Sequence, residues 1–279
     1  MPHFRLLALD IDGTLVNSRD ELTPATHAAL RRATDAGVRV VLATGRRYSR
    51  ALPLVERLEI DAPLVTASGA LVKRPSDHNT LHRAEFAPGV LEQTLAIVER
   101  AGYDAVLYGD TFHDGFDFYV PRIEVDTQPE LAEYFALNPE CHRVWPQMMR
   151  SPPPEIFAGF AVGSRPAMVE LDRVLQAELP EVLYTHVIRS PRYQGHMCEI
   201  APVGATKWSG IQRLAESWEI DPAEICAVGD DVNDIPMIEA AGLGVAMGNA
   251  VAETKAIANR IAPTHDQDGL VEVVNWLLT

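Results

Sequence analysis

The sequence has few cysteines, a deficit of basic residues and no long apolar run. Its three cysteines, Cys141, Cys198 and Cys226, are widely spaced, which is neither a disulfide framework nor a zinc-binding pattern. Asp and Glu total 39 against 24 for Lys and Arg, so the formal net charge is −15. This balance argues against non-specific nucleic-acid or anionic-membrane binding, which requires a basic face. Since no stretch approaches the ~20 apolar residues of a membrane span, we expect a cytoplasmic protein without nucleic-acid or membrane partners.

What the sequence does have is a regular alternation of strand and helix patterns at both ends. The 279 residues suffice for one large domain or two moderate ones. Strands are expected at 5–10, 38–43, 63–67, 224–228 and 243–246. Helical patterns between them begin at Pro24 and near residues 49, 205, 234, 249 and 270. This alternation predicts an α/β fold with a doubly wound, mostly parallel sheet.

The middle of the chain has a different pattern. Helices are expected there at 88–101, 129–137 and 165–178. Between them the strand-like pieces come in pairs, at 103–108, 112–119, 156–162, 182–188 and 192–200. Paired strands of this kind are typical of an α+β layer with an antiparallel sheet. We therefore expect a discontinuous core domain, residues 1–82 and 200–279, with an inserted cap domain over 83–199.

Two carboxylates follow the first strand. Leu6 to Leu9 form a short apolar run, and Asp10-Ile11-Asp12-Gly13-Thr14 comes directly after it. In an open α/β sheet, ligands bind beyond the carboxyl ends of the strands. Asp10 and Asp12 project the same way from an extended backbone, so their repulsion favours a bound cation or a shared proton. The alternative interpretation is a plain Asx-turn that closes the strand.

Three further elements fall at strand ends or helix starts. Thr44-Gly45-Arg46 follows the second strand and has the form of an anion-binding turn, although such a turn by itself is common. Lys207 lies at a helix start, where an isolated lysine is usually solvated. Gly229-Asp230-Asp231-Val232-Asn233-Asp234 follows a buried strand, and its dense oxygen groups suit a hard cation such as Mg²⁺.

In this order the four elements resemble the motifs of the haloacid dehalogenase superfamily of phosphatases. The inserted segment is similar in position and length to the large α/β cap of the Cof-type branch. Val245 to Ala250 and the later Thr264…Asp268-Gly269 extend the resemblance through the second core segment. Two departures are visible. Ser68-Gly69-Ala70 stands where family members usually have Asn-Gly-Ala, and Trp208 follows the lysine in place of glycine.

The resemblance implies a Mg²⁺-dependent phosphomonoester hydrolase that acts on a small phosphorylated metabolite. Asp10 would be the nucleophile that forms an aspartyl-phosphate, and Asp12 the general acid and base. Mg²⁺ would be held by Asp10, Asp230 and the backbone carbonyl of Asp12. Thr44 and Lys207 would hold the transferring oxygens. Further expected phosphate or substrate contacts are Gly45, Arg46, Ser68 and Asn233, with Asp231 and Asp234 in support. We expect a monomer or a homodimer.

Two other functions stay open on the sequence alone. A phosphomutase on the same scaffold would convert a hexose 1-phosphate to its 6-phosphate instead of releasing phosphate. A catalytically silent binding or regulatory protein would be expected to lack Asp10 or Asp12, and both are present. Candidate contacts of the cap with the substrate are His186, Arg189, Arg192, Tyr193 and His196, with ordinary solvent-exposed surface as the alternative.

Overall fold

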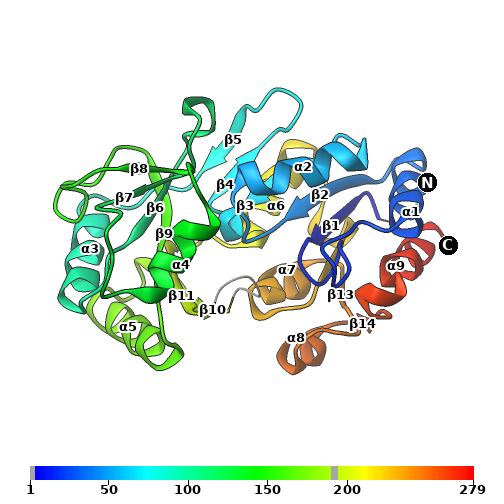
Figure 1. Cartoon of the computed structure of the whole chain (residues 1–279). Coiled ribbons are helices and arrows are strands. Elements are labelled where there is room, and N and C mark those ends of the chain that lie inside the picture. Colours follow the sequence, from blue (N-terminus) through cyan, green and yellow to red (C-terminus); the bar gives the residue numbers. More distant parts are fainter. Residues whose placement is uncertain (1–3, 190–193) are drawn as a thin grey trace. The chain divides into compact units, whose positions relative to one another are not determined.

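The chain forms two compact units. The structure is a computed structural model that describes residues 4–189 and 194–279. The first unit combines Met1–His82 with Thr206–Thr279, and the second is Arg83–Ala205 (Figure 1). The expected second boundary, 199/200, falls inside strand β11 (His196–Pro202), which pairs with neighbouring strands of the second unit along its length. The second unit therefore continues past this strand to Ala205.

The first unit is built on an eight-stranded sheet of order β14-β13-β12-β1-β2-β3-β4-β5. The strands from β14 to β3 are parallel, and β4 is antiparallel to β3. Its strands are β1 (Leu6–Asp10), β2 (Arg39–Ala43), β3 (Leu64–Thr66), β4 (Leu71–Lys73), β5 (Thr80–Arg83), β12 (Ile225–Gly229), β13 (Leu243–Ala246) and β14 (Arg260–Ile261). Its helices are α1 (Pro24–Asp35), α2 (Tyr48–Leu58), α6 (Lys207–Ser217), α7 (Ile235–Ala240), α8 (Ala252–Ile257) and α9 (Gly269–Leu278).

Strand β1 shows why this sheet forms. All five of its residues are buried, because helices cover both faces of a parallel sheet. Leu6 and Ala8 pack with Ile211 and Leu214 of α6 in one apolar cluster, and the alternation of a strand turns the intervening leucines to the other face. Helices α1 and α9, blue and red in Figure 1, pack against one another. The expected α/β core is confirmed.

The second unit has its own six-stranded sheet of order β10-β11-β9-β6-β7-β8. Every pair is antiparallel except β7 with β8. Two separate hydrophobic clusters pack on it, one with α3 and α5 and the other with α4. Besides β11, its strands are β6 (Val106–Gly109), β7 (Phe118–Val120), β8 (His142–Val144), β9 (Ile156–Gly163) and β10 (Leu183–Ile188). Its helices are α3 (Val90–Arg100), α4 (Pro129–Leu137) and α5 (Arg165–Glu178).

The differences from the sequence expectations are confined to short elements. The strand expected at 112–119 is a short 3₁₀ turn, Phe112–Asp114, followed by β7, because Gly115 takes a left-handed conformation and breaks the extended run. Strands β4, β5, β8 and β14 were not anticipated, since two to four residues are too few for a hydrophobic period to be recognised. Arg192 and Tyr193 lie outside the described residues. None of the described helices combines the length and apolarity needed to cross a membrane.

A close backbone approach determines where helix α6 begins. Thr206 caps this helix, since its side chain accepts from the backbone N–H of Ser209 while its own N–H donates to the Ser209 hydroxyl. Gly69, in the turn after β3, has a φ of +108° and packs on the Thr206 carbonyl. A Cβ at Gly69 would lie 1.9 Å from that oxygen. The turn therefore requires glycine, and it holds the helix start from which Lys207 projects.

Replacing this glycine should be far more costly than replacing another glycine with similar backbone geometry. Gly69→Ala and Gly37→Ala both place a side chain at positive φ, at a cost of about 1–2 kcal/mol. A Cβ at Gly37 meets nothing within 4 Å, whereas overlap at Gly69 should add roughly 1–3 kcal/mol. Urea unfolding of the two variants measures the difference. Equal losses of stability would show that the contact with Thr206 is not constraining.

Candidate active site

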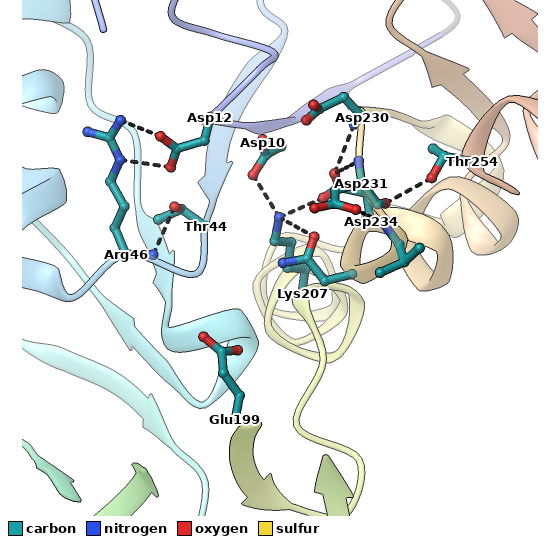
Figure 2. A network of polar contacts seen from close by, with 12 residues as sticks. Asp10, Asp12, Thr44, Arg46, Glu199, Lys207, Asp230, Asp231, Asp234 and Thr254 are labelled. Atoms are coloured by element: carbon teal, nitrogen blue, oxygen red, sulfur yellow. Dashed lines mark hydrogen bonds and ion pairs between the residues drawn. The ribbon is translucent and has the colours of Figure 1, made fainter. Parts of the chain in front are cut away.

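The predicted site residues gather at one edge of the first unit's sheet. Strand β1 ends at Asp10, and its parallel neighbours β2 and β12 lead to Thr44 and Asp230. The carboxyl ends of adjacent parallel strands share an edge, so residues far apart in sequence lie side by side there. Lys207, from the first turn of α6, points at the same place (Figure 2).

Lys207 is the buried cation of the site. Its ammonium donates to Asp10 Oδ1 and Asp234 Oδ1, each at 2.7 Å, and to Asn233 Oδ1 at 3.2 Å (Figure 2). Burial by itself would lower the pKa of Lys207, but the charges of Asp10 and Asp234 outweigh it and raise the pKa above its ordinary value. The amine is therefore charged. Three acceptors match its three N–H groups, so it acts on other ligands mainly through charge.

The carboxylates of the site outnumber this one cation. Burial raises the pKa of Asp10 well above its ordinary range, against the opposing attraction of Lys207. Burial, followed by repulsion from Asp234, raises the pKa of Asp230 from 3.8 to about 7. A cation bound here would stabilise the ionised form of both carboxylates.

The donor set fits a small, hard cation. One carboxylate oxygen from each of Asp10, Asp230 and Asp234 lies within 4.8 Å of the others. Both oxygens of Asp234 are engaged, since Oδ2 accepts from the N–H groups of Asp230 and Asp231 while Oδ1 accepts from Lys207. Asp230 Oδ1 is buried and accepts no hydrogen bond within residues 4–189 and 194–279. Asp10 and Asp230 are thus the available side-chain ligands, and oxygen donors of this kind suit Mg²⁺.

The acidic stretch after β12 is also a folded turn. Asp231 caps it by accepting from the Val232 N–H at 2.7 Å. A Cβ on Gly229 would lie 2.3 Å from the Asp234 side chain, so glycine is needed for that carboxylate to be buried. Asp231 and Asp234 therefore hold the turn in shape, while Asn233 reaches Lys207.

Asp12 is turned toward an arginine and away from this cluster. Its two oxygens accept from Arg46 Nε at 2.8 Å and Nη2 at 2.6 Å, a bidentate pair (Figure 2). Asp20 accepts from the same Nη2 at 2.5 Å. The two carboxylates raise the pKa of Arg46 in spite of its burial. The guanidinium of Arg46, which was expected to contact phosphate, thus pairs with the carboxylates of Asp12 and Asp20. The Asp12 side chain is not part of the cluster formed by Asp10, Asp230 and Asp234.

Thr44 is built to present a hydroxyl. Its backbone N–H donates to the Val65 carbonyl at 2.8 Å, and its carbonyl accepts from the Ser68 N–H at 3.0 Å. The side chain is fully buried, and its oxygen accepts from the Arg46 N–H at 3.0 Å. The hydroxyl proton then remains as a donor. Gly45 lies in the bend that follows, and Ser68 is buried in a left-handed conformation in the turn after β3.

Sequence reasoning missed Asn249. Its Nδ2 donates to the Gly13 carbonyl at 2.8 Å and contacts Asp230 Oδ2 at 3.3 Å. Its Oδ1 accepts from the His265 N–H at 3.0 Å. Asn249 therefore orients Asp230 while tying together three segments of the sheet edge. The available signal was an asparagine in a turn after β13, which belongs to the same row of parallel strands.

Comparison with known proteins agrees with this geometry. The pattern that defines the haloacid dehalogenase-like hydrolase family matches residues 7–274. The chain belongs to this family. Phosphatase YwpJ of Bacillus subtilis (strain 168) is 30% identical over 98% of this chain and 100% of its own length. Phosphatase YitU of the same organism, named for 5-amino-6-(5-phospho-D-ribitylamino)uracil, is 28% identical over 95% of this chain and 94% of its own length.

Two further relatives complete the comparison. The chloroplastic endoribonuclease YBEY of Arabidopsis thaliana is 28% identical over 98% of this chain, which spans only 46% of that protein. A solved haloacid dehalogenase-like hydrolase from B. subtilis has a TM-score of 0.78 and 26% identity, and covers 98% of this chain and 100% of its own. The resemblance to Cof-type phosphatases of this superfamily is confirmed, and the chain is an enzyme of the phosphatase class.

The raised pKa of Asp230 gives a test of the metal-free site. Between about pH 3.8 and 7 the folded protein holds a proton at Asp230 that the unfolded chain has lost. Raising the pH across this window therefore lowers the free energy of unfolding. Asp230→Asn removes this contribution, and it also removes the repulsion by which Asp230 raises the pKa of Asp10, which acts in the same direction. In EDTA, wild type should lose stability relative to Asp230→Asn between pH 5 and pH 8 in urea unfolding. Parallel pH dependences would contradict the raised pKa.

Proposed function

We propose that this hydrolase cleaves small phosphate monoesters with Mg²⁺, through transfer of the phosphoryl group to Asp10. The observation that carries the proposal is the setting of Asp10. It ends a buried strand, its Oδ1 accepts from the charged Lys207 at 2.7 Å, and one oxygen of Asp230 lies within the same cluster of carboxylates. A carboxylate fixed beside cationic groups is suited to attack phosphorus, because its repulsion from an anionic ester is reduced.

The reaction divides into two steps. In the first, an oxygen of Asp10 attacks phosphorus, the bond from phosphorus to the ester oxygen breaks, and Asp12 donates a proton to that oxygen. In the second, water attacks the aspartyl-phosphate, Asp12 takes its proton, and phosphate is released from a regenerated Asp10. The Thr44 hydroxyl donates a hydrogen bond to a phosphoryl oxygen, and Lys207 stabilises developing negative charge.

Mg²⁺ would be held by Asp10, Asp230 and the backbone carbonyl of Asp12, and would supply positive charge against the nucleophile and the phosphoryl oxygens. Asn249 keeps Asp230 oriented toward that position. The second unit contributes none of these residues, and we propose that it selects the substrate. Support for a phosphorylated polyol or related metabolite comes from the substrate in the name of the relative YitU. Phosphate release from a panel of sugar phosphates, nucleotides and phosphorylated cofactors identifies the preferred ester.

The nucleophile is tested by Asp10→Asn. The amide keeps the size of the side chain but is a far poorer nucleophile, so kcat for p-nitrophenyl phosphate should fall by at least about 10³-fold. Circular dichroism and the melting temperature should show an intact fold. Asp35→Asn, which changes an exposed carboxylate of α1, is the matched control and should retain full activity. Ordinary turnover by a folded Asp10→Asn protein would remove Asp10 from this role.

The metal is tested by removal and replacement. Activity should be lost in EDTA and return on titration with Mg²⁺, because the oxygen donors are arranged for a hard cation. Asn249→Ala leaves every proposed ligand in place but frees Asp230 to move. It should raise the Mg²⁺ concentration for half-maximal activity by about tenfold or more. Full activity in metal-free buffer would exclude the metal-dependent reaction.

A further inference from the structure

Arg46, which pairs with Asp12, also donates a hydrogen bond to a second carboxylate, that of Asp20. Arg46 Nη2 contacts both Asp12 Oδ1 and Asp20 Oδ1. The arginine side chain is only 10% exposed, while the two carboxylate side chains are 52% and 56% exposed. Because a guanidinium is planar and rigid, fixing one of its nitrogens fixes the edge that it presents to a bidentate partner. The position of Asp20 therefore bears directly on the orientation of Asp12.

The turn that carries Asp20 is held in several ways. Asp20 has a φ of +59°, which is unfavourable for a side-chain residue. The backbone of Asn17 nevertheless pairs with Glu21 and with Asp20 itself, at 3.0 Å each. The Asn17 side chain accepts from the N–H groups of Arg19 and Glu21. These bonds keep the left-handed residue, and hence its carboxylate, on Arg46.

The same turn is anchored to a distant part of the chain. The Ser18 N–H donates to Asp266 Oδ1 at 2.8 Å. Asp266 lies in the segment after β14 that also contains His265, whose N–H donates to Asn249. The turn is thus bonded through Ser18 to the segment that contains Asp266 and His265, while its Asp20 carboxylate contacts Arg46. A surface turn without a further role would not require these hydrogen bonds, either within the turn or to a distant segment.

We propose that Asp20 is a positioning residue for the phosphatase reaction and acts through Arg46 on Asp12. By holding Nη2, it keeps the guanidinium in the plane that pairs with both oxygens of Asp12, and so fixes the direction in which Asp12 delivers its proton. Without Asp20 the arginine can rotate, and Asp12 rotates with it. The inference rests on the proposed function, in which Asp12 is the general acid. If Asp20 made only an exposed ion pair, its loss would scarcely change folding or turnover.

The leaving group distinguishes these two roles. An alkyl phosphate needs a proton on its departing oxygen, whereas p-nitrophenolate is stable without one. Asp20→Gly removes the oxygen that holds Nη2 and tolerates the positive φ. It should therefore lower kcat/KM for an alkyl phosphate by about tenfold, since small misplacements of a catalytic group reduce rates steeply. For p-nitrophenyl phosphate the loss should stay below about twofold. Glu21→Gln, which removes a neighbouring carboxylate of the same turn, is the matched control and should leave both rates unchanged.

A second comparison tests whether the effect passes through the arginine. In an Arg46→Ala background, adding Asp20→Gly should change neither rate, because the connecting group is already gone. Equal losses of kcat/KM for both esters, no loss for either, or a full additional loss in the Arg46→Ala background would each overturn the inference. A wild-type protein that hydrolyses no ester of the panel with Mg²⁺ would instead overturn the proposed function, and this inference with it.

Discussion

The site depends on one buried ammonium group among carboxylates. Lys207 is 2% exposed and Asp234 is fully buried. Taking these charges out of water is unfavourable unless they are paired and hydrogen-bonded. The pairing is complete on the Lys207 side, where three acceptors meet three N–H groups. It is incomplete on the carboxylate side, where the pKa values of Asp10 and Asp230 are raised. This excess of carboxylates over cations is the physical basis for expecting a bound cation. The ends of the parallel strands hold these carboxylates in position.

Glycines leave room for the charged side chains of the site to pack closely together. Gly13 packs against Asp230, and a Cβ there would lie 2.2 Å from its Oδ2. Gly229 makes the corresponding room for Asp234, and Gly69 does so for the start of α6. In each case the glycine lies beside a charged or capping residue of the site. The backbone must come close so that a carboxylate or an ammonium can be surrounded by donors and acceptors.

The two carboxylates of the Asp10-Ile11-Asp12 motif have different surroundings. Asp10 is buried and shares its charge with Lys207, whereas Asp12 is half exposed and paired with Arg46. In the proposed reaction they have opposite tasks, Asp10 as nucleophile and Asp12 as proton donor, because environment sets the behaviour of a carboxylate. Arg46 orients Asp12 and leaves its outer side open to solvent. A proton carrier needs both features.

The sequence by itself determined the core strands, the order of the motifs and the chemical types at the site. Such features are local, since a short apolar run followed by aspartate is visible without knowledge of the partner segments. Only the tertiary structure decided which groups meet. Asp12 pairs with Arg46 across 34 positions, and Asn249 reaches Gly13 across 236. The direction of a side chain and the approach of two backbones depend on how the parallel strands are aligned. No periodicity along the chain records this, and so Asn249 and Asp20 were found only in the folded protein.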